Sequence, residues 1–192
     1  MVLMKDLIVE PYNIRVKIGY NPDPNSKSKG VAHLSERIDT LNSESMLYHA
    51  TALHRLEGVL AKGLDISKSS RSDERGSYLC LTWDLGHALS FAYRYLPKSP
   101  QTRLIVGAVG LDQNKLPNNI KNQLEEDPLF KDGVITRESI SPTFFSELIL
   151  TDLEGDNYDL VETAKNIERV HKLPVRTIDY DLSTARFEFR QR

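Results

Sequence analysis

The chain has 192 residues, of which 40% are apolar and 27% charged, so it is long and apolar enough to bury a core. This composition excludes intrinsic disorder and collagen-like repetition, and no apolar stretch approaches the roughly 20 residues that span a bilayer. A single cysteine cannot form an internal disulfide, and the acidic Asp6 stands where a secretory signal would have its apolar run. We therefore expect a soluble cytoplasmic protein without membrane contact.

The charge is unevenly distributed along the chain, although the formal net charge is only −2. Residues 45–111 contain eight Lys/Arg against five Asp/Glu, residues 112–168 contain five against thirteen, and residues 169–192 contain six against three. This pattern predicts a cationic and an anionic face. A ligand with a diphosphate group would favour the cationic region.

The first 44 residues are predicted to be an N-terminal elaboration of the main domain. Alternating apolar residues over 14–20 predict a strand, the Pro-, Asn- and Ser-rich residues 21–30 predict a loop, and residues 35–41 predict a short helix. The main domain is then expected to span residues 45–192.

The main domain is predicted to begin with a strand, a turn and a helix. Residues 46–50 form an apolar run typical of a buried strand, and residues 53–63 place leucine and valine on one helical face, with Gly63 as the stop signal. Alternation over residues 77–82 predicts a second strand. Its polar side would show Tyr78, Cys80 and Thr82.

The rest of the main domain predicts further short elements and no internal repeat. Asp84 can cap a helix that ends before Pro97. The other predicted elements are, in chain order, a strand over 103–111, a helix over 119–126 and strands over 143–150, 176–180 and 185–189. These elements together indicate an α+β fold.

Three positions could provide chemistry. His49 lies in the first predicted strand of the main domain, where a histidine can accept or donate hydrogen bonds. Cys80 could be a nucleophile beside a histidine, but a small buried thiol is the simpler interpretation. Glu147 stands among large apolar residues, and alternation places Phe145, Glu147 and Ile149 on one face. A carboxylate on such a face needs a partner or a cleft.

The order of three segments resembles the ADP-ribosyltransferase superfamily of His-Tyr-Glu type, which includes diphtheria-toxin-like toxins and poly(ADP-ribose) polymerases. Residues 47–51, Leu-Tyr-His-Ala-Thr, are similar to the family's His-Gly-Ser/Thr strand, with Ala50 in place of the glycine. Residues 76–84 with the Ala-Leu-Ser-Phe-Ala of 88–92 resemble its tyrosine strand and the helix beside the nicotinamide pocket. Ser146 to Leu150 resemble the strand with the catalytic glutamate. The resemblance covers about residues 46–155.

The resemblance implies a fold of two packed, mainly antiparallel small sheets with few flanking helices. It also implies that NAD is the substrate, that Glu147 is catalytic, and that His49, Thr51, Tyr78 and Phe91 bind NAD. Tyr78 is favoured as the tyrosine of the motif, although the family spacing counted back from Phe91 ends at Cys80. Glu147 would stabilise an oxocarbenium-like transition state while nicotinamide leaves.

Several alternatives remain open on the sequence alone. The acceptor could be a protein side chain or a nucleic acid, and Phe145, two residues before Glu147, stands where arginine-modifying relatives have a second glutamate, so an arginine acceptor is not expected. The tyrosine strand also resembles that of NAD-dependent RNA 2′-phosphotransferases, although the sequence shows no basic quartet like theirs. A third alternative is a catalytically inactive binding module of the same fold. The toxin, phage or housekeeping setting and the oligomeric state stay open.

Overall fold

The computed structural model describes residues 3–9, 14–20, 45–93, 105–152 and 158–178. The predicted helix over 35–41, the predicted strand over 185–189 and the stretch around Pro97 lie outside these residues. The predicted strand over 14–20 is confirmed, and it pairs antiparallel with a strand over Leu3–Val9 that the sequence did not suggest. The boundary near residue 45 stays a prediction.

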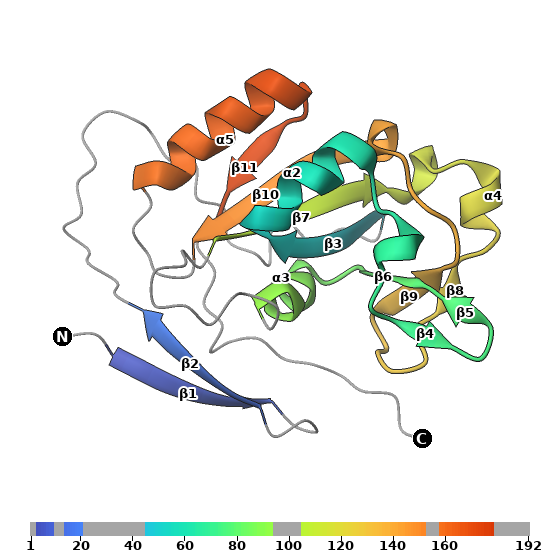
Figure 1. The fold of residues 1–192 in the computed structure, drawn as a ribbon, viewed down its shortest axis with the longest axis horizontal. Coiled ribbons are helices and arrows are strands. Elements are labelled where there is room, and N and C mark those ends of the chain that lie inside the picture. The colour runs from blue at the N-terminus through green and yellow to red at the C-terminus, as the bar shows by residue number, and fades with distance from the viewer. Residues whose placement is uncertain (1–2, 10–13, 21–44, 94–104, 153–157, 179–192) are drawn as a thin grey trace.

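The described part of the main domain contains one seven-stranded sheet, and the α+β class is confirmed (Figure 1). The strand order is β11-β10-β7-β3-β6-β9-β8, and the β10–β11 pair is parallel while the other pairs are antiparallel. The strands are β3 (Met46–Ala52), β6 (Leu79–Thr82), β7 (Ile105–Asp112), β8 (Glu125–Glu126), β9 (Gly133–Thr136), β10 (Phe145–Asp152) and β11 (Val175–Thr177). Two further sheets are two-stranded: β1–β2 and the hairpin β4 (Ser72–Asp73) with β5 (Gly76–Ser77). The expectation of two packed small sheets was therefore wrong, because hydrogen bonds join seven strands into one sheet.

The seven-stranded sheet is nearly divided between β3 and β6. These two strands share one register pair, Tyr48 with Thr82, whereas β3 and β7 are paired from Met46 to Ala52. Beyond Tyr48 the edges of β3 and β6 diverge, which separates a half-sheet β11-β10-β7-β3 from a half-sheet β6-β9-β8. This separation leaves room for a cavity between the two halves.

Helices cover both faces of the larger half-sheet (Figure 1). Helix α2 (Leu53–Lys62) and helix α5 (Tyr158–His171) bury Leu56, Leu60 and Leu160 against one face, with Leu148 of β10 in the same cluster. Helix α3 (Leu85–Tyr93) covers the other face, in the cluster that also contains Tyr48 of β3. The two faces of β3 therefore belong to different parts of the core.

Local sequence signals explain where α2 and α3 begin and end. Helix α2 follows its predicted bounds and stops at Gly63, which has φ of 87°. Asp84 accepts a hydrogen bond from the backbone N–H of His87 at 3.0 Å, as expected of an N-cap residue. Both predictions are confirmed.

Two predicted elements needed correction, and some elements of the structure were not predicted. The predicted helix over 119–126 is a single turn, α4 (Asn118–Lys121), followed by the short strand β8. The predicted strand over 77–82 is interrupted at Tyr78, between β5 and β6. Neither α5 nor β9 was predicted. No described helix has the length and apolar character needed to cross a membrane.

Candidate functional site

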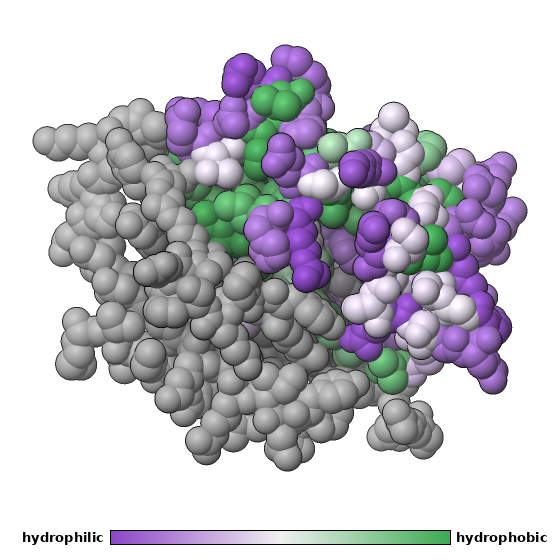
Figure 2. Space-filling view, in the orientation of Figure 1, coloured by the Kyte–Doolittle hydropathy of each residue, from purple (hydrophilic) through white to green (hydrophobic). Residues whose placement is uncertain are grey.

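A cavity of about 670 Å³ lies where the two half-sheets separate. Its walls come from β3, β6, α2, α3 and the segment that follows α2. A hollow at this place is visible between the hydrophilic side chains of the described surface (Figure 2). The volume is within the range of roughly 300–1,000 Å³ that is usual for sites of small molecules and cofactors.

His49 lies at the point where β3 leaves β6. Its Nδ1 lies 3.0 Å from the backbone oxygen of Cys80, so Nδ1–H donates and the imidazole bridges the divergence of the strands. Burial lowers the pKa of His49 below its ordinary value, which keeps the ring neutral and leaves Nε2 as an acceptor. A hydroxyl group of a ligand suits such an acceptor.

Thr51 follows on the same strand and also lines the cavity, as does Ala50 between them. On its other side this stretch of β3 is paired with β7, from His49 with Val109 to Thr51 with Gly107. In the described part of the sheet, the ladder between β3 and β6 ends at Tyr48, so the edge of residues 49–51 faces the cavity. Main-chain groups at this edge can bind an amide or a flat ring.

Aromatic rings form one wall of the cavity. Phe91 stacks on His87, with ring centroids 5.4 Å apart, and meets the edge of Phe130 at 4.8 Å. The guanidinium carbon of Arg71 lies 5.8 Å from the Phe91 ring centre, within cation–π distance. This wall offers apolar ring faces to a planar ligand.

Hydrogen bonds to Asp132 hold the aromatic wall in place. His87 Nδ1 bonds the carboxylate of Asp132, and Thr82 Oγ1 donates to the backbone oxygen of Asp132 at 2.9 Å. Burial opposes the charge of Asp132, but hydrogen bonds from His87 and Thr82 hold its pKa below its ordinary value. The ring of His87, on which Phe91 stacks, is thereby held in one orientation.

Basic side chains outnumber acidic ones around the cavity. The Lys and Arg residues that line it are Arg55, Lys62, Lys68 and Arg71, and the Asp residues are Asp65 and Asp127. Four of the eight Lys and Arg residues of 45–111 therefore lie around one cavity. A ligand with phosphate groups would gain from this excess of positive charge.

Cys80, and not Tyr78, is the residue of this pair that lines the cavity. Tyr78 is buried outside that lining, with the guanidinium of Arg137 5.6 Å from its ring centre and its backbone oxygen bonded by Ser69. Burial and the nearby Asp127 raise the pKa of Cys80 to about 12. A thiol so protonated does not act as a nucleophile, which favours the interpretation as a small buried residue.

Glu147 does not line the cavity, and it is buried, with 7% of the residue exposed. It interacts with Tyr48, which does line the cavity. Arg176 of β11 forms an ion pair with its Oε2 at 2.8 Å. The prediction that Phe145 shares the face of Glu147 was wrong, because a bulge shifts the register between them. Phe145 instead packs in the core on the side of α2 and α5, so it is not placed to contact an acceptor.

Of the predicted site residues, the structure brings His49, Thr51 and Phe91 to one cavity and leaves Tyr78 and Glu147 outside its lining. Sequence reasoning missed His87, although it is four residues before Phe91 and thus on the same helical face. It also missed Phe130 and Asp132, which come from a connection without local signals. Among the described residues, no cluster of three His, Cys, Asp or Glu side chains could hold a metal ion.

The comparisons with known proteins add no relative. No known protein family matches the chain, and no curated protein matches it.

Proposed function

We propose that the protein is a mono-ADP-ribosyltransferase that binds NAD in the cavity between the half-sheets. The observation that carries the proposal is the meeting of His49, Thr51 and Phe91 at one cavity with a basic rim. Phe91 contributes to an aromatic wall beside nicotinamide, the neutral His49 accepts from a ribose hydroxyl, and the basic rim stabilises the diphosphate. The order of the three motifs in the sequence supports the same function.

In the proposed reaction, the bond between the ribose C1 and the nicotinamide nitrogen breaks, and nicotinamide leaves with the bonding electrons as a neutral molecule. The carboxylate of Glu147 stabilises the positive charge that develops on the ribose. The acceptor forms the new bond to C1 and loses a proton to solvent. The acceptor is a non-arginine protein side chain or a nucleic acid.

The first test of the proposal is NAD binding followed by nicotinamide release. Calorimetry should detect binding by the full chain, and Phe91→Ala should weaken it because the aromatic wall of the cavity loses a ring. Glu147→Gln keeps the size of the side chain, so binding should persist while release falls by about 10²–10³. Glu162→Gln changes an exposed carboxylate on α5 and serves as the matched control.

Three outcomes would contradict the proposal in different ways. No binding at millimolar NAD by the folded protein would reject the NAD site. Binding with equal release by the wild type and Glu147→Gln would remove Glu147 from catalysis, and binding without any release would favour the inactive module of the same fold.

A second candidate function is that of an NAD-dependent RNA 2′-phosphotransferase. The observation that favours it is the group of four basic side chains at the cavity, Arg55, Lys62, Lys68 and Arg71, which could hold a phosphate in addition to NAD. An RNA oligonucleotide with one 2′-phosphate separates the two functions. NAD-dependent loss of that phosphate would support the second candidate, and its persistence during nicotinamide release would support the first.

A further inference from the structure

Glu147, Gly110 and Tyr48 occupy the same level on three adjacent strands. Glu147 of β10 is paired with Gly110 of β7, and Gly110 is paired with Tyr48 of β3. Paired residues in a sheet direct their side chains to the same face. The glutamate and the tyrosine are thus separated by a residue without a side chain.

Gly110 leaves the room that Glu147 occupies. A Cβ at this position would lie 2.8 Å from Cγ of Glu147 and 2.8 Å from Cε of Met46, which is closer than real contacts allow. The backbone of Gly110 has no positive φ, so the need for glycine is the space and not the conformation. The side chain of Glu147 therefore leans across β7 toward β3.

Tyr48 is the residue that the side chain of Glu147 contacts across β7. Its side chain is fully buried and is hydrogen-bonded to the Glu147 carboxylate. Burial, followed by the charge of Glu147, raises the pKa of Tyr48 to about 12, so the phenol keeps its proton and donates it in the hydrogen bond. Arg176 holds the Oε2 of Glu147 at 2.8 Å.

Tyr48 also lines the cavity, which Glu147 itself does not. Tyr48 thus connects the lining of the proposed NAD site to the proposed catalytic carboxylate. The side chain of Glu147 reaches a residue of the cavity lining across Gly110, while Arg176 pairs with its Oε2 from the other side.

We propose that Tyr48 is a positioning residue that holds Glu147 toward the NAD cavity, and that Gly110 is required because it leaves space for this contact. This inference rests on the proposed function and extends it by two residues, Tyr48 and Gly110, to which the resemblance assigned no role. Tyr48 acts through Glu147 and is not itself catalytic.

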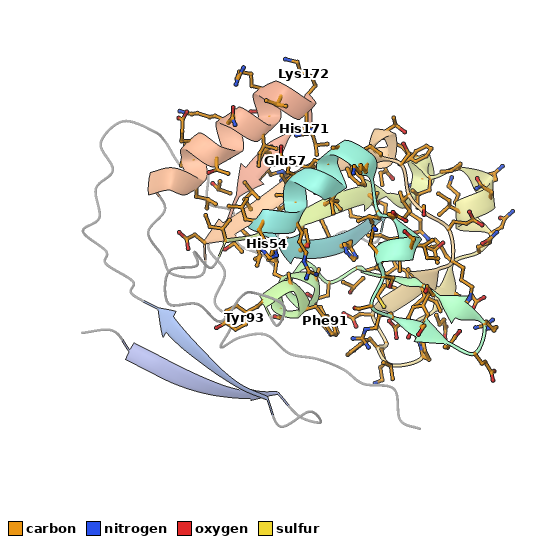
Figure 3. The ribbon with its side chains drawn as sticks, in the orientation of Figure 1. His54, Glu57, Phe91, Tyr93, His171 and Lys172 are labelled. Atoms are coloured by element: carbon orange, nitrogen blue, oxygen red, sulfur yellow. The ribbon has the colours of Figure 1, made fainter. Side chains whose placement is uncertain are left out.

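The first test is Tyr48→Phe, which removes the hydroxyl and keeps the ring. The rate constant kcat for nicotinamide release should fall about tenfold or more, the size of one hydrogen bond to a charged group, while KM for NAD stays within twofold. Tyr93→Phe is the matched control, because Phe91 and Tyr93 leave different sides of α3 and Tyr93 is outside the cavity lining (Figure 3). It should keep the wild-type kcat. An unchanged kcat in Tyr48→Phe would overturn the proposal.

The second test replaces the glycine. Gly110→Ala places a methyl group against Glu147 and should lower kcat as Tyr48→Phe does. Gly107→Ala on the same strand meets the ends of Leu56 and Leu150 on the other face, so it should lower the melting temperature and leave kcat unchanged. Equal effects of the two alanine variants on kcat would show a general disturbance of β7 and would overturn the requirement for Gly110.

A stability cycle separates failure of this proposal from failure of the proposed function. If the hydroxyl and the carboxylate are coupled, the double variant Tyr48→Phe/Glu147→Gln loses less melting temperature than the sum of the single variants. Additive losses would overturn the contact. A wild type that binds NAD but releases no nicotinamide would reject the catalytic function, and the cycle would still decide whether Tyr48 holds Glu147.

Discussion

His49 combines a half-buried position at the cavity with a hydrogen bond to the backbone oxygen of Cys80, and the loss of solvent is the stronger influence on its charge. Its pKa in the native state is lowered from the value of about 6.5 in the unfolded chain. Below pH 6.5 the unfolded chain therefore binds a proton that the native protein does not bind at this site. The native state loses stability as the pH falls through this range.

We predict that His49→Gln flattens this dependence. The free energy of unfolding of the wild type should fall between pH 7.5 and 5.5 by at most about 1.4 kcal/mol per pH unit from this group, and that of the variant should fall less. Urea unfolding at several pH values gives the comparison. Above pH 7.5 the two proteins should differ by a constant amount, and parallel curves over the whole range would contradict the assignment.

Cys80 is the single cysteine of the chain, which makes its reactivity simple to measure. Burial and Asp127 raise the pKa of its thiol from 9.0 to about 12. Because each pKa unit lowers the thiolate fraction tenfold, we expect the native protein to react about a thousandfold more slowly than an ordinary thiol at pH 8. A colorimetric disulfide reagent measures the rate, and the protein unfolded in guanidinium is the control. A rapid reaction of the native protein would argue against this environment.

At the scale of elements, α2 contains one glycine and ends at another, and the two are in opposite situations. Gly63 ends the helix with φ of 87°, and a Cβ there would clash with the backbone oxygen of Ile140. Gly58 lies inside the helix, and a Cβ there would meet nothing within 4 Å. The same substitution should therefore have opposite effects at the two positions.

Gly63→Ala should destabilise the protein by roughly 2–4 kcal/mol, because it adds backbone strain to a contact with the main chain. Gly58→Ala should stabilise it by about 0.5–1 kcal/mol through helix propensity. Chemical denaturation of both variants measures the difference. Similar effects of the two substitutions would mean that the turn after α2 adjusts without cost.

At the scale of the whole molecule, the sheet is strong in its centre and weak at one junction. Strand β7 is paired on both sides along most of its length and is buried from Ile105 to Leu111. Strand β6 is paired with β9 but shares only the Tyr48–Thr82 pair with β3. The half-sheet β6-β9-β8 is therefore joined to β3 by one register pair and the hydrogen bond from His49 to Cys80, whereas β7 is held by two long ladders.

Hydrogen exchange should reflect this difference. We expect the amides of β7 to exchange most slowly and those of β6 and β9 to exchange faster, with mass spectrometry of peptic peptides as the measurement. Saturating NAD, if bound between the halves as proposed, should slow exchange in β6 more than in β7. Equal protection of β6 and β7 in the free protein would mean that the single pair joins the halves as firmly as a full ladder.

The elements whose signals are local in the sequence were predicted correctly. The stop at Gly63 and the cap at Asp84 depend on backbone conformation and on hydrogen bonds within a few residues, so the amino acids themselves determine them. The helix over 119–126 failed because the short polar stretch there forms one turn and then pairs as β8. That pairing depends on β9, whose β-branched Val134, Ile135 and Thr136 favour a strand that the sequence analysis did not assign.

The site divides in the same way. The residue types and the order of the motifs placed His49, Thr51 and Phe91 among the candidates, and the fold brought them to one cavity. Only the tertiary structure decided between Tyr78 and Cys80 at the lining, and it separated Phe145 from Glu147 through a bulge that alternation cannot reveal. The contact between Tyr48 and Glu147 likewise depends on the register of three strands. Sequence determines which side chains are present, but distances between residues far apart in the chain are fixed by how the strands pair.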